Sequence, residues 1–539
     1  MKWFVFQISL LYIFFPHNFC SNDTENPEEK MIYSTSVMSM VKLLEMEESL
    51  KASLEVYVQE MQSKLDIIKL FQESLKRKTL TTLEEREEYM ANPLNAFPLL
   101  RRLNQDWPKW LRYIKLAIAT KKIKEIEVHL KSAPNDDDLE VALKGMARIE
   151  KMYNQHADDL TKGLLMGRKF NSYLTAPDCV ALGDFYYNTT KYSRSTHWYR
   201  MALRLHNLPQ GMLYEKVLGL KRKKIYKKYG KALLKESVAS DKAKATPVEL
   251  TEWNSLAKEV TKEDNYDNVK QLIDEYLSVD EKIFQDEAAK LRRKSSRLER
   301  GCRGEWPKKS SPELICRYNR DTSAFLNLAP LKMEFLNMQP LVVMYHDVLY
   351  ESEFKSLRDI AILNATMSDG LTYVDFDKNG KPKPQDRVVK MITFQGTTPS
   401  ATLSINRRIA DMSGLEMQEN MALFLTNYGL GSHFGKHVDY VELAERPPNF
   451  FSHLGGDRIA TALLYATDVQ LGGTTVFTKL KISVEPKKGN ALIWFNLNNA
   501  GDPDPQTEHS VCPVVMGSRW TISKWIHERQ QVFKKPCFA

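Results

Sequence analysis

The sequence predicts a multidomain protein, in which an all-α N-terminal half precedes a C-terminal double-stranded β-helix, the jelly-roll arrangement of two packed sheets. Three observations predict this. The chain has 539 residues, which is too long for one hydrophobic core. Apolar residues recur at helical spacing up to about residue 300. After Cys316, short apolar or β-branched runs alternate with Gly, Pro, Asn and Asp, as in all-β domains.

Residues 1–20 have the pattern of a secretory signal peptide, with Lys2 before an apolar run and polar residues from Ser21 onward. The apolar run is too short to span a bilayer comfortably, and no later segment comes close to doing so. We therefore expect a soluble protein of the secretory pathway. The net charge of +9 is modest for this length and does not favour nucleic-acid binding.

Residues 32–77 predict one long amphipathic helix, because apolar side chains lie three, four or seven positions apart and Glu and Lys fill the other face. This stripe fits a helix in a bundle or the seam of a coiled-coil dimer. The turn at Asn92-Pro93 should let the helical stretch 96–118 fold back on the long helix.

A second helical unit follows the loop 134–138. Between residues 174 and 205, the spacing of small and aromatic residues predicts a tetratricopeptide-like helix-turn-helix, with Gly183 and Ala202 where the helices approach closely. The unit is rich in aromatics, and we expect at least Tyr187 and Trp198 to pack between helices. The alternative is an aromatic-lined groove for an extended proline-rich peptide, with the candidate substrate-binding residues Tyr186, Tyr187 and Tyr192.

The next segments are more polar. The basic run 221–228 is typical of a solvated helix face, although it could dock an acidic partner. Residues 247–300 predict a further pair of helices.

The β-rich part begins after Cys316. Strands are expected at 341–345, 388–392, 421–426, 459–464 and 491–495, and helices near 352–361 and 404–412.

Because the secretory pathway is oxidising, we expect the cysteines to form disulfides. Cys302 and Cys316 bracket a short loop, and Cys512 and Cys537 bracket the last strand and the tail. Two disulfides in these pairs, with Cys179 left over, are therefore the simplest arrangement. Three sequons could carry glycans, at Asn22, Asn188 and Asn364.

Three residues near the C-terminus predict the chemistry. His437 and Asp439 form a His-x-Asp pair, and His509 follows at a distance. Two imidazoles and one carboxylate form the facial triad of non-haem Fe(II) oxygenases, which leaves coordination positions open for reactants. The same donor set can also bind zinc.

The chain resembles the collagen prolyl 4-hydroxylase alpha subunits, a family of Fe(II)/2-oxoglutarate-dependent dioxygenases, over nearly its whole length. The motifs that carry the resemblance in the C-terminal part are Asn427-Tyr-Gly-Leu-Gly, Lys436-His-Val-Asp, Asp457-Arg-Ile-Ala-Thr, Gly472-Gly-Thr-Thr-Val-Phe, Pro486-Lys-Lys-Gly, Trp494-Phe-Asn-Leu, His509-Ser-Val-Cys-Pro and Lys524-Trp-Ile-His-Glu. Asn92-Pro-Leu-Asn-Ala-Phe and Leu103-Asn-Gln-Asp-Trp resemble the family's dimerisation domain, and Leu174-Thr-Ala-Pro-Asp-Cys-Val-Ala-Leu-Gly its peptide-binding domain.

The resemblance implies an enzyme of the endoplasmic reticulum lumen that hydroxylates proline at C4 in collagen-like Xaa-Pro-Gly sequences. It implies Fe(II), 2-oxoglutarate, O2 and L-ascorbate, with 2-oxoglutarate converted to succinate and CO2. It also implies an α2β2 tetramer of two such chains and two protein disulfide isomerase chains, the β subunits. That partner would explain retention, because the chain ends without a retention tetrapeptide.

The resemblance also assigns domains. After the signal peptide, residues 21–135 correspond to the dimerisation domain, 136–245 to the peptide-substrate-binding domain, 246–330 to a helical linker with the Cys302–Cys316 loop, and 331–539 to the catalytic domain.

Site residues follow from the matched motifs. His437, Asp439 and His509 would bind iron, Tyr428 would bind the co-substrate, and His527 would act near it as a catalytic residue. Arg519 stands where the family usually has a lysine that binds the distal carboxylate of 2-oxoglutarate, and a guanidinium can also pair with a carboxylate. Phe434 stands where a tyrosine is common, so a hydrogen bond worth about 1 kcal/mol is lost if the group is buried.

Two alternatives remain open. The same chemistry could act on a non-collagen secreted proline-rich protein. The chain could also be a non-catalytic alpha-like subunit that binds collagen or the isomerase without turnover.

Overall fold

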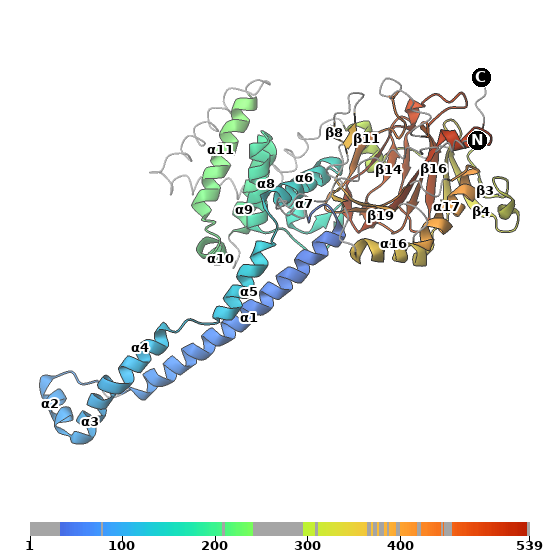
Figure 1. Cartoon of the computed structure of the whole chain (residues 1–539). Helices are drawn as coiled ribbons and strands as arrows, with labels where there is room; N and C mark the ends of the chain where they lie inside the picture. The colour runs from blue at the N-terminus through green and yellow to red at the C-terminus, as the bar shows by residue number, and fades with distance from the viewer. Residues whose placement is uncertain are drawn as a thin grey trace, which may run out of the picture.

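The computed structural model describes residues 33–76, 79–206, 211–240, 295–307, 311–363, 368–369, 374–376, 382–384, 388–394, 399–417, 422–442, Arg446 and 455–535. Figure 1 shows a long helical arm, a compact group of helices and a β-rich domain, and the base of the arm lies against the β-rich domain. None of the helices in these residues combines the length and apolarity needed to cross a membrane.

The arm is built on α1 (Val37–Ser74), which confirms the long helix predicted at 32–77. Helices α2 (Leu83–Ala91), α3 (Pro93–Arg101) and α4 (Trp107–Lys115), with a π-helical turn at Arg102–Asp106, form the tip and the start of the return, and α5 (Thr120–Lys131) packs along α1.

The predicted fold-back of the arm is confirmed. Asn92 caps α3 through its side chain, and Pro93 takes the first helical position, where it costs no hydrogen bond. The Phe71 ring of α1 stacks on the Trp110 ring of α4 at 4.1 Å. Lys64 Nζ donates to the Ile114 carbonyl at 2.9 Å, near the end of α4. These contacts fix the returning helices against α1.

The compact group of helices contains the predicted helix-turn-helix, formed by α8 (Ala176–Asn188) and α9 (Tyr192–Leu205). A Cβ on Gly183 would lie 2.6 Å from the Tyr199 ring, so only glycine allows this approach of the two helices. The surrounding elements are α6 (Asp136–Met152), α7 (Ala157–Thr161), the β1–β2 hairpin (Leu164–Leu165 and Arg168–Lys169), α10 (Gly211–Lys216) and α11 (Arg222–Ser240).

Helix α11 contains most of the basic run 221–228. Ile225, Tyr226 and Tyr229 are buried in the core that α11 shares with α9, whereas Lys223 and Lys224 are exposed. The predicted solvated basic face is therefore confirmed for these two lysines. The pair of helices predicted at 247–300 lies outside the described residues, except for its end, where α15 (Arg297–Cys302) begins.

Within the described residues, the β-rich domain has a nine-stranded sheet that faces a four-stranded sheet, in agreement with the predicted double-sheet jelly roll. The larger sheet runs in the order β3 (Cys316–Asn319), β4 (Leu331–Asn337), β5 (Val342–His346), β16 (Ala491–Phe495), β12 (Arg458–Tyr465), β19 (Arg519–His527), β10 (Leu423–Tyr428), β9 (Lys390–Phe394) and β6 (Ser368–Asp369). The smaller sheet runs β11 (Phe434–His437), β17 (His509–Val511), β14 (Thr475–Phe477) and β15 (Ile482–Val484). The remaining pairs are β13 (Leu471–Gly472) with β18 (Val514–Met516) and β7 (Val374–Phe376) with β8 (Pro382–Pro384), and short 3-10 turns lie at Ala324–Asn327, Pro505–Thr507 and Glu528–Gln531.

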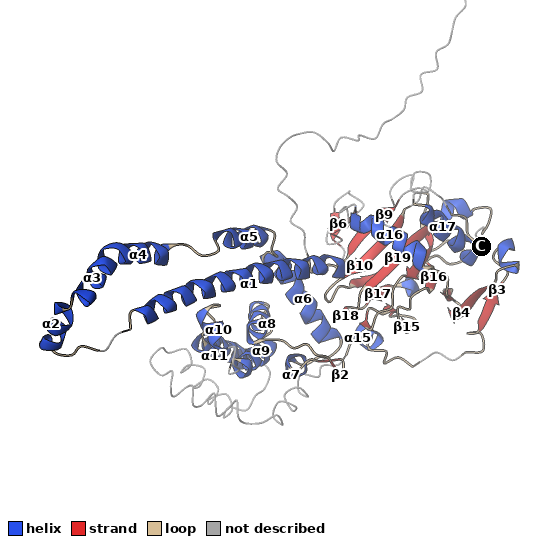
Figure 2. Ribbon diagram, turned by 90° about the horizontal axis from the view of Figure 1, so that it is seen from below, coloured by secondary structure: helices blue, strands red, loops and turns tan. Residues whose placement is uncertain are grey.

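The two faces of the larger sheet have different partners, because side chains alternate along each strand. On β12, Ala462 and Leu464 point to the core that the sheet shares with α16 (Glu351–Leu363) and α17 (Ser400–Ser413). Figure 2 shows these two helices beside the larger sheet. Leu463 and Tyr465 point the other way, into a core that also holds Phe477 of the smaller sheet. Both predicted helices and all five predicted strands of this domain are present, with ends that differ from the prediction by at most four residues.

The predicted disulfides are wrong. Cys302 pairs with Cys512, with 5.6 Å between the two Cα atoms and 210 residues between them in sequence. The reason is that α15 packs against β14 and β15, which brings Cys302 to the end of β17. Among the described residues, Cys316 in β3 is exposed and has no disulfide partner, and Cys179 is buried and has none either, as expected. Cys537 lies outside the described residues.

Candidate metal centre and co-substrate pocket

Two neighbouring strands of the smaller sheet bring the predicted metal ligands together. His437 at the end of β11 lies directly opposite His509 at the start of β17, and Asp439 follows two positions after β11. The carboxylate oxygens of Asp439 lie 3.8 Å from Nε2 of His437 and 3.8 Å from Nε2 of His509. One ligand atom from each residue lies within 4.8 Å of the others. Two atoms that each lie about 2.1 Å from one ion can be at most about 4.2 Å apart, a condition that both distances to the Asp439 carboxylate meet.

The backbone orients both imidazoles. Nδ1 of His437 donates to the Gly435 carbonyl at 2.8 Å, and Nδ1 of His509 donates to the Thr507 carbonyl at 3.0 Å. A carbonyl can only accept, so Nδ1 carries the proton and Nε2 of the neutral ring keeps its lone pair. Both lone pairs are thus available on the nitrogens nearest Asp439, as a metal site requires.

Asp439 is buried and held by a hydroxyl. Its Oδ2 accepts a hydrogen bond of 2.6 Å from Thr461 Oγ1, and the Asn496 amide donates to the same hydroxyl at 3.0 Å. Burial opposes ionisation of the carboxyl, but the positive charge that the imidazoles of His509 and His437 carry when protonated and the Thr461 hydroxyl outweigh it and hold the pKa of Asp439 below its usual range. The ionised form is the one that binds a cation.

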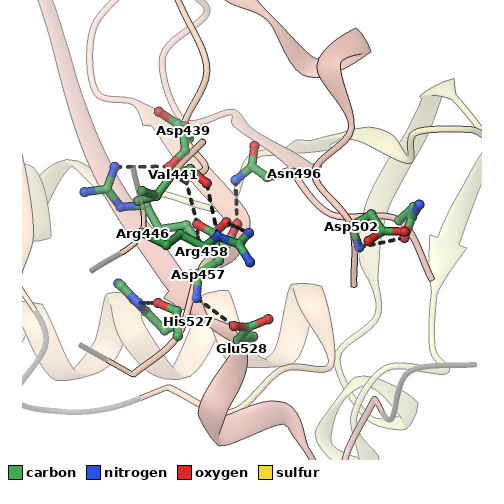
Figure 3. A network of polar contacts seen from close by, with 11 residues as sticks. Asp439, Val441, Arg446, Asp457, Arg458, Asn496, Asp502, His527 and Glu528 are labelled. Carbon is green, nitrogen blue, oxygen red and sulfur yellow. Dashed lines mark hydrogen bonds and ion pairs between the residues drawn. The ribbon is translucent and has the colours of Figure 1, made fainter. Parts of the chain in front are cut away.

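A polar network supports the backbone of Asp439 and of the residues that follow it (Figure 3). Arg458 Nη1 donates to the Asp439 carbonyl at 3.1 Å, and its guanidinium lies 3.9 Å from the centre of the Trp525 ring. Asp457 accepts from the Val441 amide at 2.9 Å and from Arg446 at 2.6 Å. The segment from Asp439 to Val441 is therefore held against β12.

Aromatic rings pack against both histidines. Phe434, the residue that departs from the family pattern, stacks on His437 at 3.6 Å with only 9° between the rings. Trp494 lies edge-to-face against His509 at 4.7 Å. These contacts restrict rotation of the two imidazoles.

Arg519 begins β19 and is fully buried between the sheets. Its Nε donates to the Gly473 carbonyl at 3.0 Å, and Nη2 donates to Thr475 Oγ1 at 3.3 Å. The guanidinium lies 4.4 Å from the Tyr428 ring centre and 5.7 Å from that of Tyr465.

The charge of Arg519 is not neutralised by any residue that the structure describes. Its Nη1 is buried without a hydrogen-bond partner, and no carboxylate pairs with it among the residues that the structure describes. A buried guanidinium with an unused donor is unfavourable unless an anion binds there. This environment therefore suits the carboxylate of a small acid, as predicted for Arg519, with the Tyr428 ring beside the guanidinium.

His527 lies at the opposite end of β19 from Arg519, roughly 26 Å away along an extended strand at about 3.3 Å per residue. Its Nδ1 donates to the Gly456 carbonyl at 3.0 Å, and burial lowers the pKa of the imidazole. No contact with the three metal-ligating residues is present among the described residues. A catalytic role for His527 stays a prediction.

The structure corrects one of the three candidate peptide-binding tyrosines. Tyr186 is buried, and its hydroxyl donates to Glu150 of α6 at 2.6 Å, so it belongs to the core. Trp198 is also buried and donates to Glu150 at 3.2 Å, as expected of a packing residue. Tyr187 and Tyr192 are partly exposed, with ring centres 5.5 Å apart, and Tyr187 also packs against the core of the helical unit, as expected.

Of the three candidate glycosylation sites, only Asn188 lies among the described residues. Asn188 is exposed at the end of α8. Asn22 and Asn364 lie outside the described residues.

Several functional residues had no role assigned from the sequence. Thr461, Arg458 and Asn496 support Asp439 from β12 and the loop after β16, and Thr475 and Gly473 hold Arg519. The first two lie in the motif that begins at Asp457, yet spacing alone does not reveal which side of a strand faces the metal site.

The two-sheet scaffold, the His-Asp-His cluster and the buried arginine define an oxygenase of the 2-oxoglutarate/Fe(II) class. Residues 423–527 match the family model described as the 2OG-Fe(II) oxygenase superfamily, which implies Fe(II) and 2-oxoglutarate. Residues 36–167 match the family model of the prolyl 4-hydroxylase alpha-subunit N-terminal region.

Similar curated proteins cover almost the whole chain. The prolyl 4-hydroxylase subunits alpha-1 of Bos taurus and Homo sapiens are each 32% identical to it, over 94% of this chain and 95% of theirs. A crystal structure of a viral collagen prolyl hydroxylase from Paramecium Bursaria Chlorella virus-1, a complex with 2OG, is 17% identical, with a TM-score of 0.28 over 34% of this chain and 94% of that one. The chain belongs to the prolyl 4-hydroxylase alpha-subunit family.

Proposed function

We propose that this chain is a catalytic alpha subunit that hydroxylates proline at C4 in collagen-like Xaa-Pro-Gly sequences, while 2-oxoglutarate is converted to succinate and CO2. The observation that carries the proposal is the pairing of an intact His437–Asp439–His509 cluster with the unneutralised Arg519 in one sheet sandwich. A subunit without catalytic activity would gain nothing from a buried, unpaired charge in the same domain as three oriented metal ligands, so this combination favours a catalytic role.

Each residue has a physical role in this reaction. His437, Asp439 and His509 would hold Fe(II), which supplies the redox chemistry with O2, and L-ascorbate would serve as the reductant. Arg519 would bind the distal carboxylate of 2-oxoglutarate through its free Nη1. Tyr428 and Tyr465 exclude water from that charge, which strengthens its interaction with an anion. Thr461 keeps Asp439 aimed at the metal.

The proposed assembly is an α2β2 tetramer with protein disulfide isomerase in the endoplasmic reticulum lumen. The exposed apolar side chains along α1, among them Leu54, Met61 and Leu65, support contact with a second alpha chain. The signal-peptide pattern at 1–20 supports entry into the secretory pathway, although these residues lie outside the described part.

The proposed reaction is tested by co-expressing the full chain with protein disulfide isomerase and measuring succinate with Fe(II), 2-oxoglutarate and ascorbate. We expect succinate release that depends on a (Pro-Pro-Gly) repeat peptide, and 4-hydroxyproline in that peptide. Succinate release that responds only to other secreted proline-rich peptides would move the substrate outside collagen. If no peptide stimulates it although 2-oxoglutarate binds, a non-catalytic role is favoured.

We also propose that Tyr187 and Tyr192 contact the peptide, since a partly exposed aromatic pair suits proline rings. Tyr187→Ala should raise the KM for a (Pro-Pro-Gly) repeat about tenfold, equivalent to about 1.4 kcal/mol. The KM for 2-oxoglutarate should not change. Tyr173→Ala, at a tyrosine that is 67% exposed just before α8, is the matched control and should leave both values unchanged. An unchanged peptide KM in Tyr187→Ala would remove Tyr187 from the peptide site.

A further inference from the structure

Three polar residues just before α1 are buried, and Tyr33, which precedes them, is partly buried. Ser34, Thr35 and Ser36 have exposed fractions of 5%, 0% and 0%. We call Tyr33–Ser36 the N-terminal anchor. Such complete burial of small polar residues is uncommon unless their hydrogen bonds are satisfied. The anchor is therefore a docked segment with specific partners.

The first partner is Asp138, in the first turn of α6. Its Oδ2 accepts from the Tyr33 amide and its Oδ1 from the Ser34 amide, both at 2.9 Å. Asp138 is itself 3% exposed, so both bonds are shielded from water. The neighbouring Asp136 and Asp137 are exposed and have no such contact. Asp138 is thus the clamp that holds the anchor to the helical domain.

The second partner is the loop Gly429–Ser432, which follows β10 of the catalytic domain. The Leu430 amide donates to the Ser34 carbonyl at 3.2 Å, and Ser432 Oγ donates to the Thr35 carbonyl at 3.3 Å. A Cβ on Gly429 would lie 2.4 Å from the Ser34 carbonyl oxygen and 2.5 Å from the Ser36 nitrogen. Only glycine allows the two backbones to lie this close.

The anchor is connected to the co-substrate pocket by one side chain. Asn427 accepts from the Met38 amide, in the first turn of α1, at 3.4 Å. The amide group of Asn427 donates to Ser518 Oγ at 3.1 Å and to the Arg519 carbonyl at 3.4 Å. The next residue, Tyr428, lies against the Arg519 guanidinium. The Asn427 side chain therefore links the start of α1 to the backbone of Arg519, the residue proposed to hold 2-oxoglutarate.

We propose that the N-terminal anchor positions Arg519 for 2-oxoglutarate, with Asn427 as the connecting residue and Asp138 as the clamp. This inference rests on the proposed function, because it requires that Arg519 binds the co-substrate. When the anchor is docked, the loop after β10 is fixed and Tyr428 stays against the guanidinium. When it is released, the aligned pocket is only partly populated, and the apparent affinity falls by that fraction.

The test compares two isosteric substitutions in the same turn of α6. Asp138→Asn removes one acceptor from the anchor, and Asp137→Asn makes the same charge change at the helix N-terminus without touching it. The full chain, co-expressed with protein disulfide isomerase and loaded with Mn(II), is titrated with 2-oxoglutarate by calorimetry. We expect Asp138→Asn to raise the dissociation constant about tenfold and Asp137→Asn to leave it unchanged.

Two further readouts separate positioning from general damage. Hydrogen exchange should become faster in residues 427–432 of Asp138→Asn, while kcat at saturating 2-oxoglutarate and the KM for peptide stay within about twofold of the wild-type values. Ser432→Ala removes the bond to the Thr35 carbonyl together with the bond that Ser432 Oγ accepts from the Gly429 amide. It should give the same rise in the dissociation constant, and it is the deciding variant if Asp138→Asn does not fold. Wild-type affinity in both variants would overturn the inference. Failure of the wild-type chain to bind 2-oxoglutarate would instead overturn the proposed function.

Discussion

His437→Ala will lower peptide-dependent succinate release by about three orders of magnitude or more. The metal contributes several kcal/mol to the reaction, and each 1.36 kcal/mol corresponds to a factor of ten. His437 supplies one of the two imidazoles, and its Nε2 lies 3.8 Å from the Asp439 carboxylate. Without it, the two remaining ligands hold Fe(II) too weakly to keep it at the site. Turnover and Co(II) binding, followed by absorption spectroscopy, measure the effect.

The control for this substitution is His346→Ala. His346 is also partly buried, but it lies on β5 and contacts Glu334 at 3.0 Å, away from the metal cluster. It should keep both Co(II) binding and turnover. Retention of either property in His437→Ala would show that the cluster is not the metal centre.

The metal ligands could be predicted from the sequence, whereas the groups that support them could not. A His-x-Asp pair with a distant His has few other purposes, so identity and spacing were sufficient. The position of Thr461 beside Asp439 depends instead on which face of β12 points to the smaller sheet. Burial alternates along a strand only when one face is solvated, and β12 is covered on both faces. Its sequence therefore contains no such signal.

The errors in the helical and cysteine predictions have different origins. Tyr186 lies four positions after Leu182 and so on the same buried stripe of α8, whereas Tyr187 is rotated by about 100° toward the surface. Helical phase could have excluded Tyr186. The Cys302–Cys512 bond spans 210 residues, and pairing cysteines by their proximity in sequence cannot predict a bond over such a separation. The burial of Ser34, Thr35 and Ser36 in the N-terminal anchor could not be predicted from the sequence either, because such polar residues are typical of an exposed loop.

Arg519→Met will weaken 2-oxoglutarate binding about a hundredfold or more without lowering the stability of the ligand-free protein. Losing the charged partner of a buried carboxylate costs roughly 3 kcal/mol, which is a factor of more than a hundred in affinity. The wild-type arginine is fully buried, and its Nη1 has no hydrogen-bond partner. Replacing it with an apolar side chain of similar length removes an unneutralised charge from the interior, a change that is often neutral or stabilising.

Thermal unfolding with and without ligand tests both halves of this expectation. With Mn(II) present, 2-oxoglutarate should raise the melting temperature of the wild-type chain, because a ligand that binds only the folded state stabilises it by mass action. It should have no effect on Arg519→Met, whose ligand-free melting temperature should equal or exceed that of the wild type. Arg407→Met, at an exposed arginine of α17 in the same domain, controls for the loss of one positive charge and should respond like the wild type.

The opposite result would assign Arg519 to the architecture of the domain. If Arg519→Met unfolds at a much lower temperature and still binds 2-oxoglutarate, then the bonds from Nε to Gly473 and from Nη2 to Thr475 matter more than the free Nη1. Arg519→Lys distinguishes charge from geometry. A lysine keeps the charge but cannot donate to Gly473, Thr475 and a carboxylate in one plane, so it should restore part of the affinity and not all of it.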